Sequence, residues 1–233
     1  SDSGAGNLAI TSECISQIID FSKEHNKKSI CFVTGVPGAG KTLAGLNIAN
    51  LRSNYLEEEH AVFLSGNGPL VDVLREALTR DKVKTAKDEN KIITKAYALS
   101  QVKSFIQPIH HFRDNYIKDK EAPIERVTIF DEAQRAWTKE QAASFMKRNK
   151  GNSDFNKSEP EFLIEVMDRH KDWCTIVCLI GGGQEINTGE AGLKEWIRPF
   201  AEKFNDWSIY YSSKITEDVN YIKDEDALAI LKK

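Results

Sequence analysis

The chain has 233 residues, of which 40% are hydrophobic and 29% charged, a composition typical of a globular protein rather than a disordered one. Its 32 Lys and Arg against 35 Asp and Glu give a net charge of −3, which excludes a histone-like basic protein but not one that binds a nucleic acid in a local groove. No signal peptide is visible, and no apolar run reaches the roughly 18 residues of a membrane span, so we expect a soluble, cytoplasmic protein with no membrane contact. Its four cysteines are expected to be free core thiols.

The first residues are expected to form a disordered leader over 1–9. The chain does not begin with Met, so we expect a processed start or an excised part of a longer protein. Thr11 or Ser12 is predicted to cap a helix that runs to about His25. The almost wholly apolar run 29–34 then indicates a strand covered on both faces.

Strands and helices alternate along the rest of the chain. Further strands are predicted at 61–64, 127–130, 174–180 and 207–211. One helix is predicted after the glycine-rich loop and runs to about residue 54, and another begins at residue 68. Further helices are predicted over 138–148, 161–170 and 190–204, with a short helical patch at 227–231. This alternation predicts an α/β domain over 10–212 with three layers, in which helices cover both faces of a parallel sheet of about five strands. Residues 213–233 are expected to be a tail or linker.

The stretch of about 87–120 is predicted to be a helical insertion that Pro108 bends or divides. Over 81–121 it carries nine Lys and Arg against six Asp and Glu. Such a mild positive bias is more often a solvated helix face than a nucleic-acid site.

A phosphate-binding pattern follows the first predicted strand. The Walker A pattern G-x-x-x-x-G-K-[ST] is matched in full by Gly35, Val36, Pro37, Gly38, Ala39, Gly40, Lys41 and Thr42. Its glycines allow the loop to wrap a phosphate, whose charge then faces backbone N–H groups and a helix N-terminus. Lys41 should reach the β- and γ-phosphates, and Thr42 should bind Mg²⁺. The pattern therefore predicts a nucleoside triphosphate site.

Two acids end the predicted strand at 127–130, in the manner of a Walker B motif. Asp131 would lie at the carboxyl edge of the sheet and hold Mg²⁺ through water. Glu132 can polarise the attacking water as a general base, which favours a hydrolase over a small-molecule kinase. Taken alone, such a pair could also be a solvated turn.

The remaining motifs favour ATP over GTP. The string nearest to a guanine-reading Asn-Lys-x-Asp element has Glu159 in place of the Asp, and the string after the third strand lacks the glycine of Asp-x-x-Gly. Gln184 follows three glycines beyond the fourth strand, where it is placed to sense the γ-phosphate or the lytic water. The alternative is an ordinary glycine-rich loop.

Four strings, at 33–42, 63–70, 130–137 and 179–186, resemble in this order the first RecA-like domain of a superfamily 1 helicase motor. They are most similar to a bacterial family of unknown function that is grouped with the helicase domain of Schlafen proteins. The resemblance implies an ATPase in which Gln184 senses the γ-phosphate and Gln134 couples hydrolysis to the binding of single-stranded DNA or RNA. Ser65 and Asn67 occupy the place of a strand-contacting loop but lack its usual threonine-rich form.

The resemblance also marks Gln17 as a candidate adenine-reading glutamine, although a surface glutamine on a helix is the alternative. Such motors carry arginine fingers on a second RecA-like domain, for which no room remains after Tyr211. We therefore expect the N-terminal motor half of a longer protein, with weak ATPase activity by itself. Two other interpretations stay open: a signalling or defence ATPase that acts as a switch on a protein partner, and a P-loop kinase or toxin-like phosphotransferase.

Overall fold

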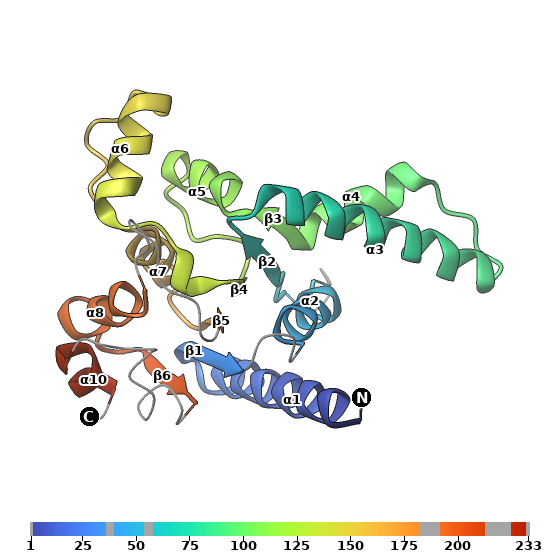
Figure 1. The fold of residues 1–233 in the computed structure, drawn as a ribbon, viewed down its shortest axis with the longest axis horizontal. Coiled ribbons are helices and arrows are strands. Elements are labelled where there is room, and N and C mark those ends of the chain that lie inside the picture. Colours follow the sequence, from blue (N-terminus) through green and yellow to red (C-terminus); the bar gives the residue numbers. More distant parts are fainter. Residues whose placement is uncertain (1, 36–39, 54–57, 182–191, 213–224, 232–233) are drawn as a thin grey trace.

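The fold is a six-stranded parallel sheet between two layers of helices (Figure 1). The computed structural model describes residues 2–35, 40–53, 58–181, 192–212 and 225–231. The strand order is β3-β2-β4-β5-β1-β6, and every pairing is parallel. The strands are β1 (Lys28–Gly35), β2 (Val62–Ser65), β3 (Ile106–Pro108), β4 (Val127–Phe130), β5 (Cys174–Gly181) and β6 (Ser208–Tyr211). The predicted three-layer α/β class is confirmed.

Alternation along the strands sends side chains into two separate cores. In β5, Ile176 and Cys178 belong to one core, whereas Val177 and Leu179 belong to the other. The second core is covered by α1 (Asp2–His25), α2 (Lys41–Leu51), α3 (Gly68–Asp88) and α4 (Lys95–Phe105). The first core is covered by α5 (Ile109–Lys118), α6 (Lys139–Lys150), α7 (Glu159–Asp168), α8 (Lys194–Glu202) and α10 (Glu225–Leu231).

The predicted insertion at 87–120 is not wholly helical, because it contains β3, a strand that the sequence analysis did not predict. Ile106 of β3 pairs with Phe63 of β2, and Pro108 pairs with Ser65 at the sheet edge. Three residues are too few to show a period of two, so the helical periodicity on either side hid this strand. Pro108 does divide the segment, since it is the N-cap residue of α5.

Both ends of the chain differ from expectation. Helix α1 begins at Asp2, so the disordered leader predicted for residues 1–9 is wrong, and Thr11 lies inside the helix rather than at its cap. Once Ile15 and Ile19 are buried against the sheet, each added helical residue needs only propagation, which is far easier than nucleation.

At the other end, the region 213–233 was expected to be a tail or linker, but its described part, α10, packs on the domain. Leu231 is buried in the first core and its carbonyl accepts a hydrogen bond from Tyr211 Oη at 2.8 Å. Leu231 and the partly buried Ile230 therefore contribute apolar contacts that hold α10 on the first core, beside α8.

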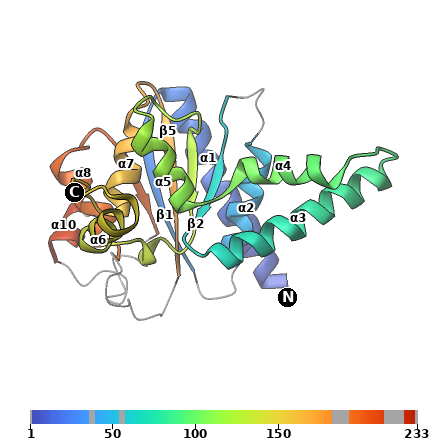
Figure 2. The ribbon, with the colours of Figure 1, turned by 90° about the horizontal axis from the view of Figure 1, so that it is seen from above.

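Helices α3 and α4 form an arm, here defined as residues 68–105, that extends beyond the sheet and its covering helices (Figure 2). Thr94 caps α4, which returns along α3 toward the sheet. Among the described helices, none is long and apolar enough to cross a membrane. Cys31, Cys174 and Cys178 are buried free thiols as expected, whereas Cys14 is exposed on α1.

Candidate functional site

The ends of three neighbouring strands bring the predicted site residues to one edge of the sheet. Gly35 at the end of β1 is in register with Gly181 at the end of β5, and β4 ends next to β5. Because all strands are parallel, the segments after their carboxyl ends emerge on the same side, where ligands bind in open α/β sheets.

Lys41 and Thr42 are the first residues of α2, directly after the predicted phosphate-binding loop. Gly40 is the N-cap residue of this helix and has a φ of 80°, a left-handed conformation that glycine adopts without strain. Lys41 Nζ donates a hydrogen bond to the carbonyl of Gly35 at 2.8 Å. Burial lowers the pKa of Lys41, and the nearby charges of Glu132 and Asp131 act in the opposite direction.

Val36, Pro37, Gly38 and Ala39, the middle of the predicted loop, lie outside the described residues. Gln184, the predicted γ-phosphate sensor, also lies outside them.

Asp131 is buried at the end of β4 and faces the start of α2. Thr42 Oγ1 donates a hydrogen bond to Asp131 Oδ1 at 3.1 Å, although the two residues are 89 positions apart in the chain. Burial raises the pKa of Asp131 to about 6, against the opposing effect of this hydrogen bond. The hydroxyl and carboxylate oxygens are the hard ligands that Mg²⁺ prefers, and a bound cation would favour the ionised carboxylate. The pair therefore fits a magnesium site.

Glu132 is held by a network that reaches across to β5. It adopts a left-handed conformation with a φ of 49°, which is uncommon for a residue other than glycine and occurs often at functional sites. Gln134 Nε2 donates to Glu132 Oε2 at 2.6 Å, and Gln134 Oε1 accepts from the Gly181 N–H at 3.0 Å. Gln134 therefore joins the acid to the strand that leads toward residue 184.

Glycine at position 181 is required by this network. A Cβ atom there would lie 2.6 Å from both Gln134 Nε2 and Glu132 Oε2, closer than unbonded atoms approach. The turn that carries Glu132 and Gln134 is held by α8, because Trp196 Nε1 donates a hydrogen bond to the carbonyl of Ala133 at 2.8 Å. Sequence reasoning missed Trp196, since no local pattern distinguishes it from another buried tryptophan.

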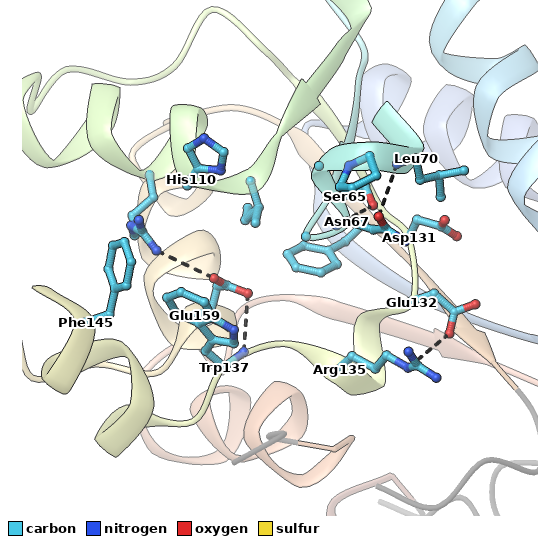
Figure 3. Close-up of a pocket in the computed structure, with 16 residues that line it drawn as sticks. Ser65, Asn67, Leu70, His110, Asp131, Glu132, Arg135, Trp137, Phe145 and Glu159 are labelled. Atoms are coloured by element: carbon cyan, nitrogen blue, oxygen red, sulfur yellow. Dashed lines mark hydrogen bonds and ion pairs between the residues drawn. The ribbon is translucent and has the colours of Figure 1, made fainter. Parts of the chain in front are cut away.

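A pocket of about 640 Å³ opens beside Asp131 and Glu132 on the side away from α2 (Figure 3). One wall is the loop between β2 and α3. Within it, Asn67 caps α3 by accepting from the Leu70 N–H at 3.1 Å, and Ser65 Oγ accepts from the Asn67 N–H at 3.1 Å. The two polar residues of the predicted strand-contacting loop therefore stabilise the loop itself at the rim of the pocket.

The opposite wall contains a buried arginine that the sequence did not reveal. Arg113 is 2% exposed, and its guanidinium lies 5.5 Å from the centre of the Trp137 ring and 5.0 Å from that of Phe145. Its Nη1 is 3.9 Å from Glu159 Oε2. Burial raises the pKa of Glu159 to about 7, while a hydrogen bond from the Trp137 N–H and the charge of Arg113 oppose this shift.

Gln17 lies on an exposed face of α1, where its Nε2 donates to Glu13 Oε1 at 3.4 Å. This contact is what a surface glutamine would make, and the adenine-reading role stays a prediction.

A protein-family model matches most of the chain. Residues 28–231 match the family model described as Schlafen group 3, DNA/RNA helicase domain. Among solved structures, the chain is similar to the crystal structure of the Pyrococcus furiosus Hef helicase domain, with a TM-score of 0.43 and 15% identity. That match covers 88% of this chain and 39% of the solved one. No curated protein matches the chain.

Proposed function

The chain belongs to the Schlafen group 3 DNA/RNA helicase domain family, and from this premise we propose that it binds and hydrolyses ATP as the first motor domain of a DNA or RNA helicase or translocase. The observation that carries the proposal is the contact between Thr42 and Asp131, with Lys41 beside them. A P-loop hydroxyl paired with a buried strand-end carboxylate is the arrangement that Mg²⁺-ATP binding requires.

Each residue at this edge then has a defined part in hydrolysis. Lys41 exchanges the carbonyl of Gly35 for the β- and γ-phosphate oxygens, and the N-terminus of α2 faces the negative charge of the phosphates. Thr42 and Asp131 would hold Mg²⁺, and the bound ion would supply positive charge to the phosphates. Glu132 accepts a proton from the attacking water.

Gln134 is placed to couple hydrolysis to strand binding. Its amide contacts Glu132, and Glu132 and Asp131 also line the pocket that the loop of Ser65 and Asn67 borders. A single strand bound at that rim would therefore lie within reach of the hydrolytic carboxylate. Gln184, three residues after Gly181 in the sequence, is proposed to sense the γ-phosphate.

We propose further that a second RecA-like domain of the parent protein completes the site. Removing an arginine finger reduces turnover by about 10³–10⁵-fold, so this domain alone should bind ATP well and hydrolyse it slowly. Glu132 argues against the phosphotransferase alternative, because a base that activates water would direct the phosphoryl group to water instead of to an acceptor substrate.

The test is steady-state ATPase activity with and without single-stranded DNA and RNA, for this chain and for its full-length parent. We expect stimulation by one kind of strand in the parent. Lys41→Ala should abolish or greatly weaken ATP binding because a charge-assisted phosphate contact is lost. Glu132→Gln should retain binding and stop hydrolysis, whereas equal loss of both would refute its role as the base. ATP binding without stimulation by any strand would favour a switch that acts on a protein partner.

A further inference from the structure

The arm differs from the rest of the molecule in charge. Residues 68–105 contain eight Lys and Arg against five Asp and Glu, whereas the whole chain has a net charge of −3. Every residue of the arm is described by the structure, and the arm extends away from the domain into solvent (Figure 2). A partner located beyond the sheet and its covering helices can therefore contact the positive charges of the arm.

Five of the eight positive residues lie on one side of the arm, whereas Arg75 and Lys82 are turned toward β3 and α4: Arg75 donates to the carbonyl of Ile106, and Lys82 lies over the Phe105 ring. In α3, Arg80, Lys84 and Lys87 are four and three residues apart, the spacing of neighbours on one helix face. In α4, Lys95 Nζ donates at 2.8 Å to the same Glu76 oxygen that Arg80 Nε contacts at 2.7 Å. We call this side the basic face; its members are Arg80, Lys84, Lys87, Lys95 and Lys103, the last of which follows Lys95 by eight residues.

Most of this charge is not neutralised within the chain. Lys84, Lys87 and Lys103 are exposed, and no carboxylate of the described residues forms an ion pair with them. Asp81 and Asp88 lie at the margin of the face, further round α3. The exposed contacts of Glu76 with Arg80 and Lys95 are weak surface pairs, and a phosphate can replace them.

We infer that the basic face binds the phosphate backbone of a nucleic-acid duplex. Proteins that bind single strands add aromatic stacking platforms to a positive groove, but this face carries no aromatic side chain within the fully described arm. Tyr97, two residues after Lys95, lies on a different side. Phosphate contacts without base contacts suit a duplex of any sequence.

The position of the arm relative to the site supports this partner. Helix α3 begins at Gly68, directly after the loop of Ser65 and Asn67 at the pocket. Its 21 residues span about 30 Å, close to the roughly 34 Å of one duplex turn. The inference rests on the proposed function: a duplex joined to a strand at the loop would continue along the arm.

The experiment compares two probes of DNA and of RNA: a single strand, and the same strand continued into a duplex of about two turns. Affinity is measured between about 50 and 200 mM salt for the wild-type protein and for the triple variant Lys84→Gln, Lys87→Gln, Lys103→Gln. We expect the variant to lower the salt slope for the junction by about three, one unit for each lysine, and to weaken junction binding at least tenfold near 100 mM. Single-strand affinity should not change.

A matched control removes the same charge at the amino edge of the sheet, with Lys27→Gln, Lys118→Gln and Lys171→Gln, all exposed. This control should bind both probes like the wild type. If the two triple variants bind the junction equally well, the arm has no part in duplex binding, although the motor proposal stands. If the wild-type protein binds neither probe, the proposed function fails and this inference fails with it.

Discussion

Gly181→Ala directly perturbs the network of Gln134 and Glu132 that is proposed to act in hydrolysis, because it adds one carbon atom where there is no space. The new Cβ would lie 2.6 Å from Gln134 Nε2 and from Glu132 Oε2. Both atoms belong to side chains that can move, whereas Gly181 is fixed in β5 by its pairing with β1. The substitution therefore displaces Gln134 and Glu132 rather than the strand.

The structure gives the size of the effect. Two hydrogen bonds are lost: the neutral one from Gly181 N–H to Gln134, about 1 kcal/mol, and the one from Gln134 to the Glu132 carboxylate, about 1.5–3 kcal/mol. Since 1.36 kcal/mol is tenfold in rate, the loss of orientation at Glu132 should lower ATP turnover by about 10- to 100-fold. ATP affinity should be retained, because Lys41 and Thr42 are not displaced.

The assay measures turnover and ATP affinity on the same preparation, with thermal unfolding to show that the variant is folded. Gly68→Ala is the matched control, since nothing lies within 4 Å of a Cβ atom at that position. A folded Gly181→Ala variant with turnover within about twofold of the control would show that the bond from Gln134 to Glu132 has no role in hydrolysis.

Three further predictions concern stability, each measured by chemical denaturation. Glu159→Gln should match the wild type only below about pH 4 and become more stable than it by on the order of 3 kcal/mol above pH 7, because a folded-state pKa of about 7 against 4.5 when unfolded makes the wild type lose stability as pH rises through that window; parallel pH profiles would contradict this. Gly45→Ala should lower the free energy of unfolding by about 1–2 kcal/mol despite its better helix propensity, because its Cβ would lie 2.8 Å from Leu179 Cδ1; a gain in stability would show that the core has room. Trp196→Phe should lower it by about 1–3 kcal/mol by leaving the buried Ala133 carbonyl without its donor, and an unchanged midpoint would refute that role.

The sequence predicted the strands well where burial is continuous. The strand at 127–130 has the predicted bounds, β5 is one residue longer at its end, and β1 is one residue longer at each end, because strands buried on both faces appear as unbroken apolar runs. β3 escaped detection because its three residues gain their strand geometry from β2 rather than from their own pattern.

The site also has a part that local sequence patterns predict and a part that depends on packing between distant elements. Thr42 and Asp131 could be expected to meet, since each follows a strand whose end is fixed by the parallel sheet. Arg113 and Glu159 could not, because α5 and α7 bring them together only through packing of their apolar faces, and neither residue stands in a recognisable motif. Pair contacts between helices carry no local signal in a single sequence.

The order of strands in the sheet has a consequence for how the protein is made. β1 lies between β5 and β6, so its sheet partners are synthesised about 140 residues or more after it. At about 5–20 residues per second, a ribosome needs roughly 10–30 s to cover that distance. β1 is thus without both of its sheet partners while those residues are made, and it completes its pairing only when β6 has emerged.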